Sequence, residues 1–280
     1  MTRAGILGAS GLVGGHLSTA LRARGDEVVA ASLRDPVKAA AQVAGCDVVV
    51  NLAGENVAQR WTSAAKQRIR ASRVEAPRAF LDALARQERK VTAYICASAV
   101  GYYPPSETAT YTESSSPGTD FLGQVCVEWE REANRAIDLG LRVAVLRTGV
   151  VLAANGGALA KMLPAFRMGL GGVIGSGRQW ISWIHIDDLA GIYLHAIDGH
   201  RGVFNATAPQ PVTNAELTRA LGAALHRPTI FPVPVFALGL LLGEGATILT
   251  EGQRVLPERT LAEGYRFRHT CLDDALTDLL

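Results

Sequence analysis

Three evenly spaced glycines near the amino terminus constrain the fold of this 280-residue chain more than any other feature. Gly8, Gly11 and Gly14 follow a short apolar run, Ala4–Leu7, and open a stretch with helical spacing. At such a strand-to-helix turn a Cβ atom would keep the backbone away from a pyrophosphate, whose charge the free N–H groups of the helix attract. In this position the spacing predicts a dinucleotide-binding turn rather than only a close helix–strand contact.

The first half of the chain alternates β-branched runs with helical stretches. We expect strands at Ala4–Leu7, Glu27–Ala31, Asp47–Leu52, Thr92–Ala97 and Arg142–Arg147. Helical patterns occupy Gly14–Arg24, Thr62–Arg89 with a potential break at Pro77, and Gly123–Leu139. Continuous apolar runs such as Val48–Val50 are typical of strands covered on both faces, as in a parallel sheet. The alternation predicts an α/β fold with a Rossmann-type, doubly wound parallel sheet.

The sequence pattern changes at about residue 150, where glycines begin to punctuate short apolar segments. A further β-turn-helix unit follows at 202–225, and the carboxyl terminus is helical in pattern. We therefore predict a dinucleotide-binding Rossmann domain over residues 1–150 and a smaller α/β substrate subdomain over residues 151–280. Part of residues 178–205 is expected to return to the first domain.

Composition argues against several classes of protein. With 28 Lys+Arg against 26 Asp+Glu, the formal charge of +2 gives no basic footprint for nucleic acid or an anionic membrane. The four cysteines form no C-x-x-C pair, which argues against a zinc site or a disulfide scaffold. Pro232, Pro234 and Glu244 interrupt the most apolar segment, and no signal-peptide pattern opens the chain. We expect a soluble, cytoplasmic monomer or homodimer that binds no metal and acts on a small molecule.

The end of the second expected strand indicates which dinucleotide would bind. An NAD site places a carboxylate there to hold the ribose hydroxyls, whereas this chain has Ser32 and Arg34. A guanidinium can bind a 2′-phosphate with two parallel hydrogen bonds, so the pattern favours NADP(H). Asp35, one residue further, would keep NAD as the alternative.

Several longer strings carry a resemblance to a known family. They are Asn51–Asn56, Arg60–Thr62, Ser72–Arg73, Ala97–Tyr103, Gly175–Trp180, Trp183–Asp188, Thr207–Pro209 and Glu251–Pro257. In these strings the chain resembles extended short-chain dehydrogenases/reductases, and within them the atypical branch called epimerase family proteins of the NAD-dependent epimerase/dehydratase group. The resemblance spans essentially the whole chain. It implies a Rossmann-type fold, a bound NADP(H) and a carboxyl-terminal substrate subdomain, with no settled substrate.

The resemblance also implies roles for individual residues. The pyrophosphate would be held by Gly8, Ser10, Gly11, Leu12, Val13 and Gly14. Ser32 and Arg34 would face the adenosine ribose. The rest of the cofactor path would be lined by Leu52, Ala53, Gly54, Glu55, Arg73 and Ala97, and its nicotinamide end would lie near Gly149 and Val150.

The catalytic pattern of the superfamily fails in this chain. Its Tyr-x-x-x-Lys pair supplies a proton at the reacting oxygen, and the lysine charge lowers the tyrosine pKa. The matching helix here offers Phe121 or Leu122 in place of the tyrosine, and Val125 or Cys126 in place of the lysine. Two hydroxyl groups remain as predicted catalytic groups: that of Ser98, at the position of the superfamily's serine, and that of Tyr102, or alternatively Tyr103, just beyond it. Packing or local hydrogen bonding are the structural alternatives for both.

For several other polar residues the sequence gives less evidence of a functional role. Arg178 is a candidate for binding an anion, although nucleotide-sugar epimerases place their arginine where Ile181 stands. We interpret His185 as a core histidine and Asp187 and Asp188 as residues that open a helix, rather than as metal ligands. Glu130 is expected to be a solvated helix residue. The four tryptophans, at positions 61, 129, 180 and 183, either wall an apolar pocket or belong to the core.

Two functions stay open on the sequence alone. One is an NADP(H)-dependent oxidoreductase or isomerase of a small carbonyl or hydroxyl compound. The other is a non-catalytic NADP(H)-binding sensor, which the missing Tyr/Lys pair permits.

Overall fold

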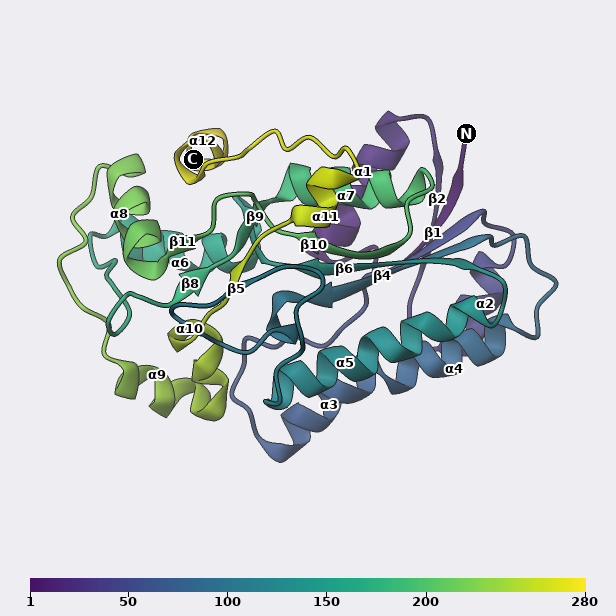
Figure 1. Ribbon diagram of the computed structural model, residues 1–280, viewed down its shortest axis with the longest axis horizontal. Coiled ribbons are helices and arrows are strands. Elements are labelled where there is room, and N and C mark those ends of the chain that lie inside the picture. The colour runs from purple at the N-terminus through teal and green to yellow at the C-terminus, as the bar shows by residue number, and fades with distance from the viewer.

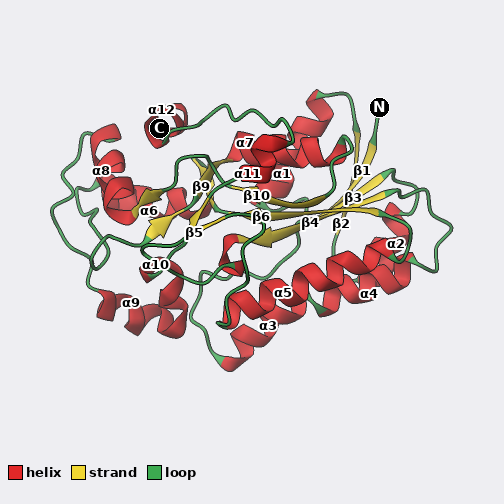
Figure 2. Ribbon diagram, in the orientation of Figure 1, coloured by secondary structure: helices red, strands yellow, loops and turns green.

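The computed structural model describes all 280 residues and is built on one parallel sheet of six strands (Figure 1, Figure 2). The strands are β1 (Arg3–Leu7), β2 (Glu27–Ala31), β3 (Val48–Asn51), β4 (Ala93–Ala99), β6 (Arg142–Thr148) and β10 (Gly202–Ala206). The first five confirm the strands expected from the sequence, with ends displaced by at most two residues. The predicted α/β fold with a doubly wound parallel sheet is confirmed.

The order of the strands creates a crevice at the carboxyl ends of the neighbouring strands β1 and β3. The order is β2-β1-β3-β4-β6-β10, so β1 pairs with β2 on one side and with β3 on the other. Between β2 and β3 the chain therefore crosses over β1 and continues in the opposite direction. Ligands of open α/β sheets bind at such a switch point, outside the carboxyl ends of the strands.

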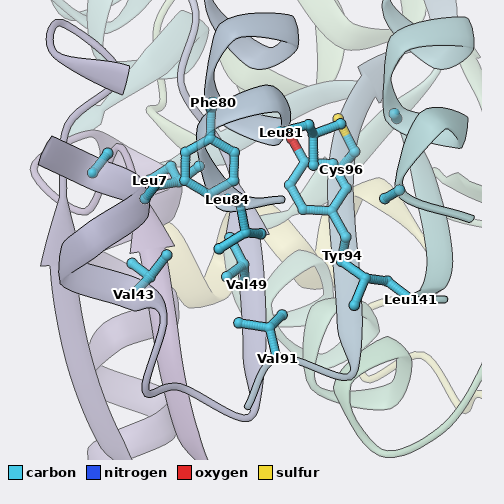
Figure 3. Close-up of a cluster of buried hydrophobic side chains, with 14 of the residues drawn as sticks. Leu7, Val43, Val49, Phe80, Leu81, Leu84, Val91, Tyr94, Cys96 and Leu141 are labelled. Atoms are coloured by element: carbon cyan, nitrogen blue, oxygen red, sulfur yellow. The ribbon is translucent and has the colours of Figure 1, made fainter. Parts of the chain in front are cut away.

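Helices cover both faces of the sheet and bury its apolar side chains. On one face lie α1 (Leu12–Ala23) and α7 (Ile186–Ile197); on the other lie α2 (Pro36–Val43), α4 (Glu75–Leu84) and α5 (Phe121–Asn134) (Figure 1). Figure 3 shows the second of these cores, where Phe80 and Leu84 of α4 pack on Val49 and Tyr94 of the sheet. Burial on both faces explains why the strands read as continuous apolar runs.

The long helical pattern at 62–89 forms two helices, α3 (Ser63–Arg73) and α4, separated at Val74. The break precedes Pro77 by three residues, because proline is tolerated in the first turn of a helix and not in its interior. The α2 segment was not expected from the sequence; Pro36 at its first position and Asp35 as its cap are the signals that mark it.

The second half of the chain contributes to two regions. The strand β10 pairs with the main sheet, and the helix α7 packs on it. A separate apolar cluster joins α6 (Gly157–Arg167), α8 (Asn214–Ala224) and α12 (Leu272–Leu279). The smaller strands are β5 (Thr110–Tyr111), β7 (Val150–Ala153), β8 (Trp180–Ile181), β9 (Trp183–His185), β11 (Val212–Thr213) and β12 (Arg254–Val255). The remaining helices are α9 (Val235–Leu242), α10 (Thr247–Thr250) and α11 (Glu258–Ala262). None of the helices combines the length and hydrophobicity that crossing a membrane requires.

The start of α1 is fixed by a close backbone contact with the end of β1. A Cβ atom on Gly14 would lie 2.2 Å from the carbonyl oxygen of Gly8, so only glycine allows the helix to approach this turn. The next residue, Gly15, is exposed, and a Cβ atom there would come no closer than 3.8 Å to any neighbour, the carbonyl oxygen of Ala9. The two adjacent glycines therefore differ in what they contribute to stability.

This difference predicts opposite effects of the same substitution. Gly14→Ala is expected to lower the free energy of unfolding by about 1–3 kcal/mol, because the added methyl group must displace backbone. Gly15→Ala is the matched control and is expected to raise it by about 0.5–1 kcal/mol, because alanine is the better helix former. Urea unfolding followed by circular dichroism measures both, and equal effects of the two substitutions would contradict the close contact.

Candidate functional site

The glycine turn brings the end of β1 against the loop that follows β3. Gly8 has a φ of +91°, and a Cβ atom on it would lie 3.1 Å from the backbone nitrogen of Ala53. The predicted cofactor residues on these two segments, 8–14 and 52–54, are therefore neighbours at the switch point of the sheet. This proximity follows from the parallel pairing of β1 with β3, which places their carboxyl ends side by side.

Gly11 differs from the two packing glycines. It is exposed, and a Cβ atom on it would meet only the carbonyl oxygen of Gly8, at 3.4 Å. It is also the N-cap of α1, where no side chain accepts a hydrogen bond from the first turn. Most helices satisfy these N–H groups with a capping side chain. The open, uncapped end of α1 is thus a cradle that fits an anion.

The end of β2 carries the residues predicted to face the ribose. Ser32 and Arg34 are both exposed, and the Arg34 N–H donates to Ser32 Oγ (3.3 Å). Oδ1 of Asp35 accepts a hydrogen bond from the Lys38 N–H (3.0 Å) and so caps α2. The carboxylate that would favour NAD therefore has a structural task, and the Arg34 guanidinium is the charged group left open to solvent.

The side chain of Arg73 holds the loop that follows β3 in place through hydrogen bonds to its backbone. Its Nη1 donates to the carbonyl oxygens of Glu55 (3.0 Å) and Ile69 (3.2 Å), and its guanidinium lies 5.1 Å from the ring centroid of Trp129. A Cβ atom on Gly54 would come within 3.1 Å of this guanidinium. Burial lowers the pKa of Arg73 from its usual value. Arg73 therefore positions the Gly54–Glu55 segment along the predicted cofactor path.

A cavity of about 490 Å³ opens beside the carboxyl ends of β4 and β6. The predicted nicotinamide residues Gly149 and Val150 line it, as do Phe121 and Leu122, which stand in the tyrosine position of the superfamily. Its other walls come from the loop before α3, from β8 and from the segment around α10. These segments lie far apart in the sequence, and only the fold brings them together.

Two of the four tryptophans, Trp61 and Trp180, line this cavity, whereas Trp129 and Trp183 are buried in the core. Cys126 is also buried, and burial raises the pKa of its thiol to about 12, which agrees with a packing role. The sequence had left both readings of the tryptophans open, and each applies to two of them.

The cavity also contains carboxylates to which the sequence assigned no role. Asp120, Glu244 and Glu251 line it. Oδ1 of Asp120 accepts from the Gly123 N–H (2.8 Å) as the cap of α5. Partial burial in the cavity, together with the charge of Asp120, raises the pKa of Glu251. The position of Asp120 directly before a helical pattern marks it as a helix cap. No feature of the neighbouring sequence indicates that it also lines the cavity.

Ser98 does not line this cavity. It is 3% exposed, and its hydroxyl donates to Glu130 Oε1 (2.7 Å). Glu130 in turn pairs with Arg147, whose Nε and Nη2 lie 2.8 Å from its two carboxylate oxygens. The expectation that Glu130 is solvated was wrong: α5 packs on the sheet, and this carboxylate is 8% exposed. A catalytic role of Ser98 stays a prediction, and it requires the hydroxyl to leave Glu130.

Tyr102 and Tyr103 join the same network rather than the cavity. The Arg147 guanidinium lies 3.3 Å from the ring centroid of Tyr102 and donates to the Tyr103 hydroxyl (2.9 Å). The Tyr103 hydroxyl donates to Asn205 Oδ1 (2.7 Å). Burial raises the pKa of Tyr103 to about 12, against the opposing effect of Arg147. A proton-transfer role of Tyr102 also stays a prediction, because its ring serves as a platform for Arg147.

The anion candidate Arg178 lies outside the cavity. Its side chain is 73% exposed and pairs with Glu107 (3.0 Å). Two glycines that precede it, Gly175 and Gly177, have positive φ values and shape the turn. The structure therefore places this arginine on the surface, and its role in anion binding stays a prediction.

His185 ends β9 and caps α7, which agrees with its interpretation as a core histidine. It is 1% exposed, and its Nδ1 accepts a hydrogen bond from the Asp187 N–H (3.1 Å). Asp187 and Asp188 lie in the first turn of α7, as expected for acidic residues at a helix start. Candidate ligand atoms of His185, Asp187, His269 and Asp278 lie within 4.8 Å of one another, a grouping the sequence did not predict. The absence of a metal stays a prediction.

Comparison with known proteins identifies the family. Residues 4–206 match the model of the NAD dependent epimerase/dehydratase family. The chain belongs to this family. Residues 233–279 match a second model, a domain of unknown function (DUF1731). The family expected from the sequence motifs is thereby confirmed.

Individual relatives extend the match over the whole chain. The human epimerase family protein SDR39U1 is 40% identical over 287 residues, which cover 98% of each chain. A homolog from Arabidopsis thaliana described as chloroplastic is 45% identical over 242 residues, 85% of this chain and 70% of that protein. These relatives carry a family name but no stated substrate.

Solved structures agree with the sequence comparison. The crystal structure of human SDR39U1 with NADPH superposes with a TM-score of 0.90 at 36% identity, over 99% of this chain and 98% of that one. A nucleoside-diphosphate sugar epimerase from Corynebacterium glutamicum gives a TM-score of 0.82 at 34% identity, over 99% of this chain and 58% of that one. A UDP-glucose 4-epimerase from Thermotoga maritima, at 16% identity and a TM-score of 0.81, shares the fold.

The buried pair Glu130–Arg147 gives a stability prediction. Arg147→Met should lower the free energy of unfolding by about 3–5 kcal/mol, because it leaves the Glu130 carboxylate buried without its counter-charge. The double variant Glu130→Gln/Arg147→Met should recover at least half of this loss, since no net charge then stays buried. Denaturant unfolding measures both variants. A double variant less stable than Arg147→Met would contradict the pairing.

Proposed function

We propose that this chain binds NADP(H) and uses it for hydride chemistry, as an oxidoreductase or isomerase, on a small carbonyl or hydroxyl compound. The observation that carries the proposal is the uncapped start of α1 at Gly11, open to solvent at the switch point of the sheet. A diphosphate bridge satisfies those N–H groups and has the charge that the helix dipole favours. The NADPH bound to the human relative supports the choice of cofactor.

The exposed Arg34 supports NADP(H) over NAD. It stands where a 2′-phosphate of the adenosine ribose would lie, and Asp35 is occupied as the cap of α2. The predicted phosphate residues 8–14 and the loop residues Leu52, Ala53 and Gly54 converge on the same crevice. Arg73 and Glu55 belong to this proposal as residues that shape the cofactor path, and Ala97 as a residue on the strand beside it.

The cavity is the proposed substrate site. A bound nicotinamide supplies or accepts a hydride at this end of the sheet. Gly149 brings the chain close to Ser182, since a Cβ atom on it would lie 2.2 Å from that carbonyl oxygen. Trp61, Phe121 and Trp180 give the cavity apolar walls that exclude water and orient a substrate. The chain offers no Tyr/Lys pair there, and Ser98 and Tyr102 are held in the Arg147 network.

A non-catalytic NADP(H) sensor is the second candidate, and the missing Tyr/Lys pair is the observation that favours it. Phe121 and Leu122 line the cavity where the superfamily has its proton donor. Action in the cytoplasm and a monomeric or homodimeric state stay predictions for either function. One relative, from Arabidopsis thaliana, is described as chloroplastic.

Cofactor preference can be tested at Arg34. Wild-type protein should show a larger thermal shift with NADPH than with NADH at equal concentrations. Arg34→Ala should weaken NADPH binding by about tenfold and leave NADH nearly unchanged, because only the 2′-phosphate loses a charged partner. The control is Arg86→Ala. Arg86 follows the end of α4, is exposed and forms no ion pair. An equal loss for both cofactors would remove Arg34 from the ribose site.

Turnover separates the enzyme from the sensor. Purified protein is incubated with NADPH and a panel of carbonyl compounds, and the absorbance of the reduced cofactor is followed in the near ultraviolet. The enzyme proposal expects consumption that depends on one class of substrate. Binding of NADPH without consumption by any compound would favour the sensor.

A further inference from the structure

The charge of the cavity identifies the class of molecule that fits it. Its 20 lining residues include the carboxylates of Asp120, Glu244 and Glu251 and no lysine, arginine or histidine. An anionic substrate would meet like charges, and none of the lining residues carries a positive charge to offset them, which is unfavourable in a partly enclosed site. The diphosphate of a nucleotide sugar therefore does not fit this cavity.

Two cations contact lining residues and leave two of the three carboxylates, Asp120 and Glu251, without an ion pair. Lys66 forms an ion pair with Glu244, which balances that one carboxylate. Arg254 lies over the Trp180 ring, 5.0 Å from its centroid, and donates to Thr110 Oγ1. Neither cation pairs with Asp120 or Glu251. The exposed carboxylate of Glu251 forms no hydrogen bond or ion pair with another residue of the chain, so it is free to pair with a charged ligand.

The aromatic lining suits a cation with an apolar body. Trp61, Phe121 and Trp180 present rings to the cavity, and ring faces attract positive charge. Two of the chain's own cations already use the rings: Lys66 Nζ lies 5.2 Å from the Phe121 centroid, and Arg254 lies over Trp180. The aromatic walls thus offer apolar surface to a ligand, and the carboxylates without an ion pair, Asp120 and Glu251, favour a positive charge on it.

The missing proton donor points in the same direction. Reduction of a ketone needs a hydride at carbon and a proton at oxygen, and the usual tyrosine for that proton is replaced here by Phe121 or Leu122. Reduction of an iminium ion needs only the hydride. The new C–H bond forms at carbon, the C=N π pair moves to nitrogen and cancels its charge, and no proton is transferred. A cavity with acidic walls and no Tyr/Lys pair is suited to this step.

We propose that the cavity binds a cationic, largely apolar amine or iminium compound, and that the carboxylates of Glu251 and Asp120 select it by charge. This inference rests on the proposed function, which supplies the reduced nicotinamide as hydride donor. Glu251 is the specificity residue, since its carboxylate lacks a partner. Asp120 adds to the field while it caps α5.

A matched pair of ligands tests the charge selection. N-methyl-3,4-dihydroisoquinolinium is permanently charged and has no transferable proton, whereas 1-tetralone has a similar fused ring system and is neutral. Isothermal titration of the full chain without cofactor should show the cation binding about tenfold or more tightly than the ketone. With NADPH present, the cation should be reduced about tenfold or more faster than the ketone. Equal or tighter binding of 1-tetralone, or reduction of the ketone alone, would overturn the proposal.

Substitution at Glu251 shows whether the carboxylate is responsible. Glu251→Gln should weaken binding of the cation by about tenfold and leave binding of 1-tetralone unchanged, because only the charge is lost. Glu88→Gln, at an exposed glutamate beyond α4, is the matched control and should change neither. Unaltered binding of the cation to Glu251→Gln would remove Glu251 from the site. Thermal shifts with NADPH, measured on all variants, should stay the same.

The outcomes also separate this inference from the proposed function. If NADPH binds and 1-tetralone is reduced while the cation is not, the oxidoreductase function stands and the charge selection falls. If NADPH does not bind, the proposed function falls, and the cofactor-free titrations still decide whether the cavity prefers a cation. If NADPH binds but neither the cation nor 1-tetralone binds, the proposed charge selection is overturned, and the proposal of cofactor binding is retained.

Discussion

The close approach of α1 to the end of β1 is the constraint on which the candidate cofactor site depends. Because a Cβ atom on Gly14 would collide with the carbonyl oxygen of Gly8, the helix can start only where both residues are glycine. That start leaves the N–H groups of the first turn without a side-chain cap, directly after the end of β1. The positive φ of Gly8 and the open position of Gly11 then leave room for an anion.

A second constraint shapes the substrate end. The Glu130–Arg147 pair connects α5 to β6, and its partners Ser98 and Tyr103 extend the network to β4 and, through Asn205, to β10. A buried charge pair is costly to disrupt, so it fixes these elements relative to one another. It also removes the hydroxyl of Ser98 from the cavity. The chemistry of the cavity is therefore left to its aromatic and carboxylate residues.

Much of the fold could be predicted because its causes are local. Strands covered on both faces are continuous apolar runs, and the glycine spacing marks the first turn, so the five strands and the family were identified correctly. The candidate site was predictable only in part. Gly149 and Val150, predicted to lie near the nicotinamide, line the cavity, and their contact with the cofactor stays a prediction. Glu130 was taken for a surface residue because a single carboxylate on a helix gives no sign of a partner on a strand.

The sequence by itself determined the parallel sheet, the glycine turn and the loss of the Tyr/Lys pair, since each is written in adjacent or regularly spaced residues. Only the tertiary structure decided the charge of the cavity. Asp120 precedes α5, whereas Glu244 and Glu251 lie on either side of α10; Lys66 pairs with Glu244, and Arg254 lies over the Trp180 ring. An electrostatic field depends on distances in space, and distances between segments far apart in the chain exist only once it has folded.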